Sequence, residues 1–278
     1  MSSDTSGDLL FIGTATTLIR FGGFTLLTDP NFLHSGESVH VGYGLHARRL
    51  TDPALELDQL PPLDLVVLSH LHEDHFDRLV AERLDRSLPI LTTGQAATAL
   101  RALGFGQARD LRTWDSWSFR KGDTRLRITA LPARHTPLAV MQPFLPLVMG
   151  SLLTFSNVAD QGSKPLLRLY ISGDTLLHEE LREIPRRFPD IDLGLFHLGG
   201  TRVLGVMLTM DGRQGAEAVR LIAPGRAIPI HYDDYDRFTS PLDDFRRAVE
   251  AAGLADKVEY LGRGDRYPLT ARAASTAG

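Results

Sequence analysis

The stretch that decides the fold is Ser69-His70-Leu71-His72-Glu73-Asp74-His75-Phe76-Asp77. Within it, three imidazoles and one carboxylate occupy four of six consecutive positions: His70, His72, Asp74 and His75. The apolar run 65–68 comes immediately before and is typical of a buried strand. Neutral imidazole nitrogens and carboxylate oxygens suit zinc, iron or manganese, and two such ions can share a nucleophilic water. The sequence therefore predicts transition metals bound where a strand ends at the edge of a sheet.

Three further predicted strands end at residues that can bind a metal: His135, Asp174 and His231. Open α/β sheets assemble their sites from side chains at the carboxyl ends of several strands. Taken one at a time, each residue has an ordinary explanation. A lone histidine is usually hydrogen-bonded, and Asp174 in Gly-Asp-Thr favours an Asx turn. Beside the cluster at 70–75 they become the expected additional ligands, because two metals need more ligands than the cluster offers.

The composition excludes several classes of protein. The 278 residues carry a net charge of −4, so there is no basic field to gather nucleic acid. Hydrophobic residues make up 43% and charged residues 23%, the balance of a globular protein with a sizeable core. The chain contains no cysteine, so metal ligands must offer nitrogen or oxygen and no disulfide can form. We expect a single domain over 1–278, with a core at about 9–265 and a frayed tail after about residue 270.

Two segments bear on targeting. Residues 1–8 are Ser-rich and acidic, without the basic and apolar regions of a secretory signal, which together with the absence of disulfides favours a cytoplasmic protein. Residues 136–159 carry no charge, but Pro137, Pro143 and Pro146 interrupt any helix long enough to cross a membrane. We therefore expect no transmembrane segment, while peripheral membrane contact and the oligomeric state stay open.

Hydrophobic periodicity predicts neighbouring strands first and alternation of strands and helices later. The expected strands are 9–13, 16–21, 24–28, 65–68, 90–91, 125–131, 152–158, 166–172, 193–196 and 227–230. The first expected helix begins at residue 74 or 75 and ends at 84. The others are 95–103, 213–222 and 241–251, the last with Ser240 as its N-cap. Residues 31–62 are irregular and rich in Gly and His, which indicates a long functional loop. This order predicts sheet layers covered by helices, in the α/β class.

The pattern His70-x-His72-x-Asp74-His75, followed by His135, Asp174 and His231, resembles the metallo-β-lactamase superfamily. It is similar in particular to the branch that includes ascorbate-phosphate lactonase-like and N-acyl-phosphatidylethanolamine phospholipase D-like proteins. Four segments resemble the signatures of that branch: Leu27–Pro30, Leu60–Asp64, Ser172–Thr175 and Ile228–Tyr232. The resemblance extends over about residues 9–250 and implies an αββα sandwich, with two mixed sheets flanked by helices.

The resemblance also implies two divalent metal ions, zinc in the first place and manganese or iron as alternatives. It assigns the first ion to three imidazoles, those of His70, His72 and His135. It assigns the second ion to Asp74, His75 and His231, with Asp174 as a bridge between the ions. Asp29 would orient a ligand. The spacing of His70 and His72 agrees with their assignment to one ion, because side chains two residues apart in an extended turn point the same way.

Three positions depart from that branch. Many of its members have Gly-His-Ala-Thr where this chain has Gly13-Thr14-Ala15-Thr16, and some have a histidine at the position of Thr209. Many have Pro-Ile-Gly where this chain has Phe196–Gly200, which introduces His197 at the end of a predicted strand. His197 has two interpretations: a hydrogen-bonded residue that supports the site, or a contact to the substrate or its oxyanion.

The predicted activity is metal-dependent hydrolysis, in which a hydroxide bridging two ions attacks a carbonyl or phosphoryl centre. Asp74 is the predicted proton acceptor, and His197 or Tyr232 the predicted oxyanion contact. The predicted substrate is a small-molecule lactone, ester or phosphodiester, with a hydrophobic acyl part as one option. The alternatives are a nuclease, a diiron redox protein and a non-catalytic member of the same fold. The absence of a basic stripe opposes the nuclease, and His72 opposes the redox protein, whose relatives usually have glutamate there.

The uncharged segment 136–159 follows His135 directly and has two interpretations. It is either a core hairpin or an apolar lid over the metals, whose wall would be formed by Leu138, Met141, Phe144 and Met149. Three residues of the Gly-rich loop are expected to be solvated or to cover the same edge: His40, Tyr43 and His46.

Overall fold

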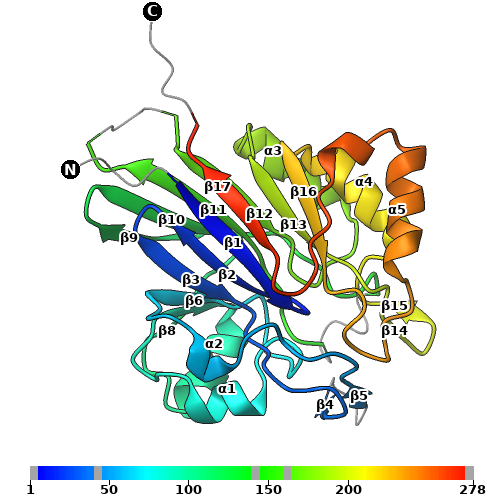
Figure 1. Ribbon diagram of the computed structural model, residues 1–278, viewed down its shortest axis with the longest axis horizontal. Coiled ribbons are helices and arrows are strands. Elements are labelled where there is room, and N and C mark those ends of the chain that lie inside the picture. The colour runs from blue at the N-terminus through cyan, green and yellow to red at the C-terminus, as the bar shows by residue number, and fades with distance from the viewer. Residues whose placement is uncertain (1–5, 41–45, 139–144, 160–163, 273–278) are drawn as a thin grey trace, which may run out of the picture.

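Two β-sheets face each other, and helices cover the outer surface of each (Figure 1). The computed structural model describes residues 6–40, 46–138, 145–159 and 164–272. The layers follow the order helix, sheet, sheet, helix, and each large sheet contains both parallel and antiparallel pairs. The expected αββα sandwich of two mixed sheets is therefore confirmed.

The first sheet combines N-terminal strands with one C-terminal strand. Its strands are β1 Ser6–Gly13, β2 Thr16–Phe21, β3 Phe24–Thr28, β6 Leu65–Val67, β7 Ile90–Thr92, β8 Ala108–Asp110 and β17 Arg266–Thr270. Within the described residues these seven strands lie in the order β17-β1-β2-β3-β6-β7-β8. The pairs from β17 to β3 are antiparallel, and the pairs from β3 to β8 are parallel. Gly22 and Gly23, with φ of 59° and 80°, form a two-residue turn between β2 and β3.

The second sheet follows the same plan. Its strands are β9 Ser116–Lys121, β10 Thr124–Leu131, β11 Gly150–Asn157, β12 Leu167–Ile171, β13 Leu193–His197 and β16 Arg226–Ile230. Over the described ranges their order is β16-β13-β12-β11-β10-β9, antiparallel from β9 to β12 and parallel from β12 to β16. Two short antiparallel pairs lie outside the large sheets: β4 Ser38–His40 with β5 His46–Arg48, and β14 Arg202–Val203 with β15 Val206–Met207.

The helices pack on the sheets through alternate strand residues. α1 Arg78–Arg83 and α2 Gly94–Ala102 cover the first sheet, while α3 Glu183–Arg187, α4 Gly212–Ile222 and α5 Leu242–Ala251 cover the second (Figure 1). On β1, Leu9 and Phe11 belong to the core between the sheets, whereas Leu10 and Ile12 belong to the core beneath α1 and α2. This is the period of two expected for a strand that is buried on both faces.

Two helices have an N-cap at a position that the sequence prediction did not give. α1 begins at Arg78 rather than at position 74 or 75, because Asp77 is its N-cap and accepts the N–H of Val80 at 2.8 Å. Asp74 and His75 therefore lie in a turn before the helix. The prediction of Ser240 as the N-cap of α5 is wrong. Pro241 holds that position, while Ser240 Oγ accepts the N–H of Gly212 and donates to Asp244, which joins the starts of α4 and α5.

The C-terminal limit of the core also differs. β17 pairs with β1 from Ser6 to Leu10, so the ordered core extends to Thr270 rather than to about 265. The sequence prediction missed β17 because Arg266 and Pro268 interrupt its apolar pattern. It also missed β8, β9, α3 and the two short pairs, one of which lies in the loop 31–62. Residues 273–278 of the expected frayed tail lie outside the described residues.

The uncharged segment 136–159 contributes to the centre of the second sheet. Its later half forms β11, and Met149 packs in the core between the sheets. Leu138 is exposed. Met141 and Phe144 of the predicted lid, and Tyr43 of the Gly-rich loop, lie outside the described residues. In the described part of the chain, every helix is too short or too polar to cross a membrane.

Asp77 should be one of the most sensitive polar positions of the fold. It is fully buried and accepts three backbone N–H groups, those of Phe32, Leu33 and Val80. Asp77→Ala leaves these donors buried without an acceptor, so we expect a loss of about 3 kcal/mol of unfolding free energy. For a chain of this size that lowers the Tm by about 6–12 °C, measured by thermal unfolding of metal-depleted protein.

The matched control is Asp85→Ala. Asp85 lies on the surface just after α1, and its carboxylate accepts bonds from Ser87 alone among the described residues. The Tm of the Asp85→Ala variant should stay close to that of the unmodified protein. Equal shifts in the two variants would show that the buried bonds of Asp77 do not stabilise the fold.

Candidate metal centre

The candidate site lies where parallel strands of both sheets end. β12, β13 and β16 run parallel, so their carboxyl ends share one edge, where three residues lie: Asp174 after β12, His197 at the end of β13 and His231 after β16. β3 and β6 are parallel neighbours in the other sheet and end before Asp29 and His70. The sandwich therefore brings together residues that are as much as 202 positions apart in the chain, counted from Asp29 to His231. All three predicted ligands outside the cluster at 70–75 lie beside it.

Two residues at this edge have strained backbones. Asp29 and His231 adopt φ of 37° and 62°, a left-handed conformation that is costly for residues other than glycine. Hydrogen bonds hold both turns: Asp29 N donates to Val67 O at 3.1 Å, and His231 N donates to Thr14 O at 2.8 Å. Such strain is typical of functional sites, because surrounding structure must maintain it.

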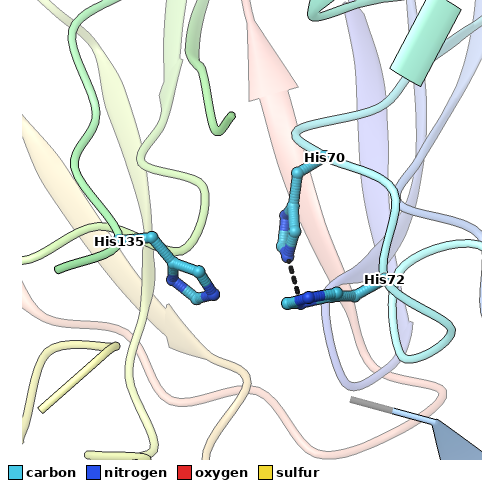
Figure 2. A group of neighbouring side chains, drawn as sticks. All are labelled: His70, His72 and His135. Atoms are coloured by element: carbon cyan, nitrogen blue, oxygen red, sulfur yellow. Dashed lines mark hydrogen bonds between the residues drawn. The ribbon is translucent and has the colours of Figure 1, made fainter. Parts of the chain in front are cut away.

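The first group of potential ligands consists of His70, His72 and His135. Figure 2 shows the three imidazoles directed toward a common space, with His70 and His72 from the loop after β6 and His135 from the loop after β10. His70 Nε2 lies 3.1 Å from His72 Nδ1. The centre of the His135 ring lies 5.3 Å from that of His70 and 5.5 Å from that of His72. One nitrogen of each ring lies within 4.8 Å of the others, a spacing at which one ion can reach all three.

The second group consists of Asp74, His75, Asp174 and His231. His75 Nε2 lies 3.3 Å from Asp174 Oδ2 and 3.8 Å from Asp74 Oδ2. His231 Nε2 lies 3.5 Å from Asp74 Oδ2. Asp174 also reaches the first group, since its Oδ2 lies 4.0 Å from His70 Nε2. Asp174 therefore lies between the two groups and could contact ions held by either.

Hydrogen bonds to the outer ring nitrogens orient the imidazoles. His135 Nδ1 lies 3.0 Å from Leu208 O, and His231 Nδ1 lies 3.2 Å from Leu198 O. A carbonyl oxygen can only accept, so Nδ1 carries the proton and the lone pair on Nε2 remains available to a metal. Ser69 Oγ, 3.0 Å from His70 Nδ1, plays the corresponding part for His70.

The protonation states of the first group and of Asp74 suit metal binding. Burial holds the pKa of His70 and His135 below the usual histidine value and lowers the pKa of His72 to about 4. Burial by itself would raise the pKa of Asp74, but the charges of His75 and His231 outweigh it and lower the pKa to about 2. Neutral imidazoles and ionised carboxylates are the forms that bind divalent transition metals.

Each residue of the second group has a buried side-chain atom to which no described residue forms a hydrogen bond. Among the described residues, four of its buried atoms are unpaired: Asp74 Oδ1, His75 Nε2, Asp174 Oδ1 and His231 Nε2. Buried polar atoms without partners are rare in native proteins and often indicate an ion or water. Nitrogen and oxygen donors in this arrangement fit zinc, manganese or iron.

Asp29 and His197 lie behind the second group. Asp29 accepts the N–H of Ser69 at 2.7 Å, and its two oxygens lie 3.7 Å from His75 Nδ1 and 3.4 Å from His197 Nε2. His197 is fully buried, and its Nδ1 lies 3.1 Å from Ser172 Oγ. Burial by itself would raise the pKa of Asp29, but the two imidazoles outweigh it and lower the pKa to about 2. Of the two interpretations of His197, this geometry favours the supporting residue.

A cavity of about 50 Å³ opens over the candidate metal ligands. Its floor includes His72, Asp74, His135 and Asp174. Its walls carry hydroxyl groups from Thr201, Thr209 and Tyr235, apolar side chains from Val203, Leu208 and Phe238, and guanidinium groups from Arg202 and Arg237.

The sequence indicated Thr209 alone among these wall residues. Most of the others belong to the β14–β15 hairpin, which turns at Leu204-Gly205, or to the segment after β16, and the periodicity identified neither. Tyr232, proposed from the sequence as an oxyanion contact, is not part of the described cavity wall and packs against the core beneath α4 and α5. Leu138 and Met149 are also outside that wall.

Solved structures share this architecture. The chain superposes on an isothiocyanate hydrolase from Delia radicum gut bacteria with a TM-score of 0.76, covering 95% of this chain and 99% of that chain at 17% identity. It superposes on a possible metal-dependent hydrolase from Veillonella parvula with a TM-score of 0.75, covering 94% and 98% at 20% identity.

The sequence comparisons agree with the fold. The chain is 28% identical over 262 residues to a metal-dependent hydrolase of Cupriavidus necator, covering 89% of this chain and 81% of that relative. The family model described as the beta-lactamase superfamily domain matches residues 25–232, a range that contains the seven candidate ligands. With its αββα sandwich and this match over most of its length, the chain belongs to the metallo-β-lactamase superfamily.

Proposed function

We propose that this protein is a dinuclear metal-dependent hydrolase of small molecules. The observation that carries the proposal is the set of unpaired buried atoms on Asp74, His75, Asp174 and His231, beside the imidazole group of His70, His72 and His135. Two bound divalent ions, zinc in the first place and manganese or iron as alternatives, would supply water activation and charge stabilisation. The activity named for the Cupriavidus relative supports the same reaction class.

Asp74 is the proposed proton acceptor. It lies on the cavity floor, its Oδ2 faces His75 and His231, and its Oδ1 has no hydrogen-bond partner among the described residues. Its low pKa keeps the carboxylate ionised at neutral pH, so it can take a proton from the attacking water. Returning that proton to the leaving group would complete hydrolysis.

The proposed substrate is a small-molecule lactone, ester or phosphodiester. The hydroxyl groups of Thr201 and Thr209 can donate to its oxygens, while Val203, Leu208 and Phe238 can contact a hydrophobic part. The net charge of −4 offers no support for a nucleic-acid substrate. The diiron redox alternative is disfavoured by His72, and the non-catalytic alternative by the assembly of all seven candidate ligands around one edge.

His197 is proposed as a positioning residue. Its Nε2 faces Asp29, which in turn faces His75 Nδ1, so His197 acts on the second ion through two intervening side chains. Its main-chain N–H donates to Ser172 Oγ at 2.9 Å, two residues before Asp174. Because His197 lies behind the candidate metal ligands, it can support them without contacting the substrate.

Replacing Asp74 tests the proposed chemistry. Asp74→Asn keeps the shape of the side chain but removes the base, so kcat for ester or lactone hydrolysis should fall by about 10²- to 10⁴-fold. Activity should be assayed with matched metal contents, determined by elemental analysis of the same samples. A variant that retains both its rate and its metals would show that the role of Asp74 is misassigned.

Replacing His197 separates its two interpretations. His197→Phe and His197→Asn place no donor toward Asp29, so affinity for one of two bound zinc ions should fall by about 10- to 100-fold. His197→Gln can place an amide N–H near the position of Nε2 and should recover part of that affinity. Zinc titration against a chromophoric chelator measures both binding steps.

A substrate contact gives the opposite result. If both zinc affinities are unchanged in all three variants while KM for an ester rises, His197 touches the substrate and the positioning role is wrong.

A further inference from the structure

The two arginines of the cavity wall have no role in holding metals. Arg202 lies on β14 and Arg237 follows β16, and both line the cavity whose floor contains His72, Asp74 and Asp174. They approach from different segments of the chain, and both are exposed. Their position over the candidate centre makes them available to a bound substrate.

Hydrogen bonds connect the wall that carries Arg202 to the candidate metal ligand His135. Leu208, at the end of the β14–β15 hairpin, donates its N–H to Thr201 O at 2.8 Å and accepts from His135 Nδ1 through its carbonyl. Thr201 N donates to Thr209 Oγ1 at 2.9 Å, which closes the base of the hairpin. The backbone of Arg202 is therefore fixed relative to His135.

The wall that carries Arg237 is fixed in a similar way. The ring of Phe238 packs on the ring of His231 at 4.4 Å between centroids, and Tyr235 Oη donates to Asn31 Oδ1 at 3.0 Å. Thr239 N and Thr239 Oγ1 donate to Gly199 O and Gly200 O, at the base of the opposite wall. Both arginines thus project from segments whose distance from the metal ligands is constrained.

Most of the hydrogen-bonding capacity of the two guanidinium groups is free. Arg237 Nε donates to His46 O at 3.1 Å, and Arg202 Nη1 donates to Gly205 O at 3.2 Å. Each guanidinium has five N–H donors, and neither has a carboxylate within 4.0 Å among the described residues. Of the described residues in the cavity lining, the acidic ones are Asp74 and Asp174, which face the candidate metal ligands. Among the described residues, the positive charge of the wall therefore lacks a counter-charge.

We propose that Arg202 and Arg237 form an anion-binding subsite, and that the substrate carries a second carboxylate or phosphate beside the group that is hydrolysed. This inference rests on the proposed function, since it places the reacting group over the metal ligands. Planar guanidinium groups bind carboxylate and phosphate oxygens through paired, charge-assisted hydrogen bonds. The subsite selects anionic esters, lactones or phosphodiesters over neutral ones.

Binding of inert ligands to the zinc-loaded protein tests the subsite without any turnover. The probes are dicarboxylates from glutarate to pimelate, each compared with the monocarboxylate of equal carbon number, and measured by isothermal titration calorimetry. One carboxylate can contact the metals, and the second can reach the arginines. At least one dicarboxylate should bind about tenfold more tightly than its monocarboxylate. In Arg202→Met with Arg237→Met, that advantage should disappear while monocarboxylate affinity is retained.

The control is Arg120→Met on the edge strand β9. Arg120 is also exposed and also donates to one backbone carbonyl, that of Gly122, but it does not line the cavity. It should leave the dicarboxylate advantage intact. Phosphonate analogues of the same lengths form a second arm, and a preference confined to them would assign the subsite to phosphate.

Two results would overturn the inference. One is equal affinity of every dianion and its monocarboxylate in the unmodified protein. The other is a loss of monocarboxylate affinity in the double variant as large as the loss for the dianions, which would assign the arginines to maintaining the metal site. Because the assay measures binding, failure to hydrolyse any ester would contradict the proposed function and leave this test unaffected.

Discussion

The burial of carboxylates between two sheets is the constraint on which the site depends. Asp74 is 6% exposed and Asp174 is 2% exposed, and both are ionised at neutral pH. A buried carboxylate costs several kcal/mol unless a cation or hydrogen bonds compensate it. The imidazoles of His75 and His231 lie within 4 Å, and the negative charge raises the pKa of both rings despite their burial. The two buried carboxylates therefore favour bound positive charge. Divalent metals supply more of this charge than the protons on His75 and His231 do.

The sandwich makes this arrangement possible by aligning strand ends. Parallel pairing of β12, β13 and β16 sets Asp174, His197 and His231 side by side, and the facing sheet contributes the 69–77 stretch. Bonds behind the ligands then fix their orientation, as those from His135 to Leu208 O and from His231 to Leu198 O do. Both carbonyls also belong to segments that continue into the cavity wall. The same short loops therefore position the candidate metal ligands and the wall of the cavity.

The sequence predicted the fold class and the seven candidate ligands because dense clusters and strand ends are local signals. His70, His72, Asp74 and His75 are adjacent, and His135, Asp174 and His231 each follow a recognisable apolar run. The start of α1 was predicted too early, because His75 and Phe76 fit a helical pattern while the capping bond of Asp77 depends on tertiary contacts with Phe32 and Leu33. The cavity wall was missed for a related reason. Arg202 and Arg237 are 35 positions apart, and only the packing of two loops against His135 and His231 brings them over one cavity.

The proposed function requires two divalent ions at this edge of the sandwich. Purified protein should be stripped with chelator, reconstituted with zinc, dialysed and analysed by inductively coupled plasma mass spectrometry, alongside His231→Ala as a variant of the second group. The account predicts two ions per chain in the unmodified protein and about one in the variant. A single ion per chain in the unmodified protein, or no ion after reconstitution with zinc, manganese or iron, would contradict it.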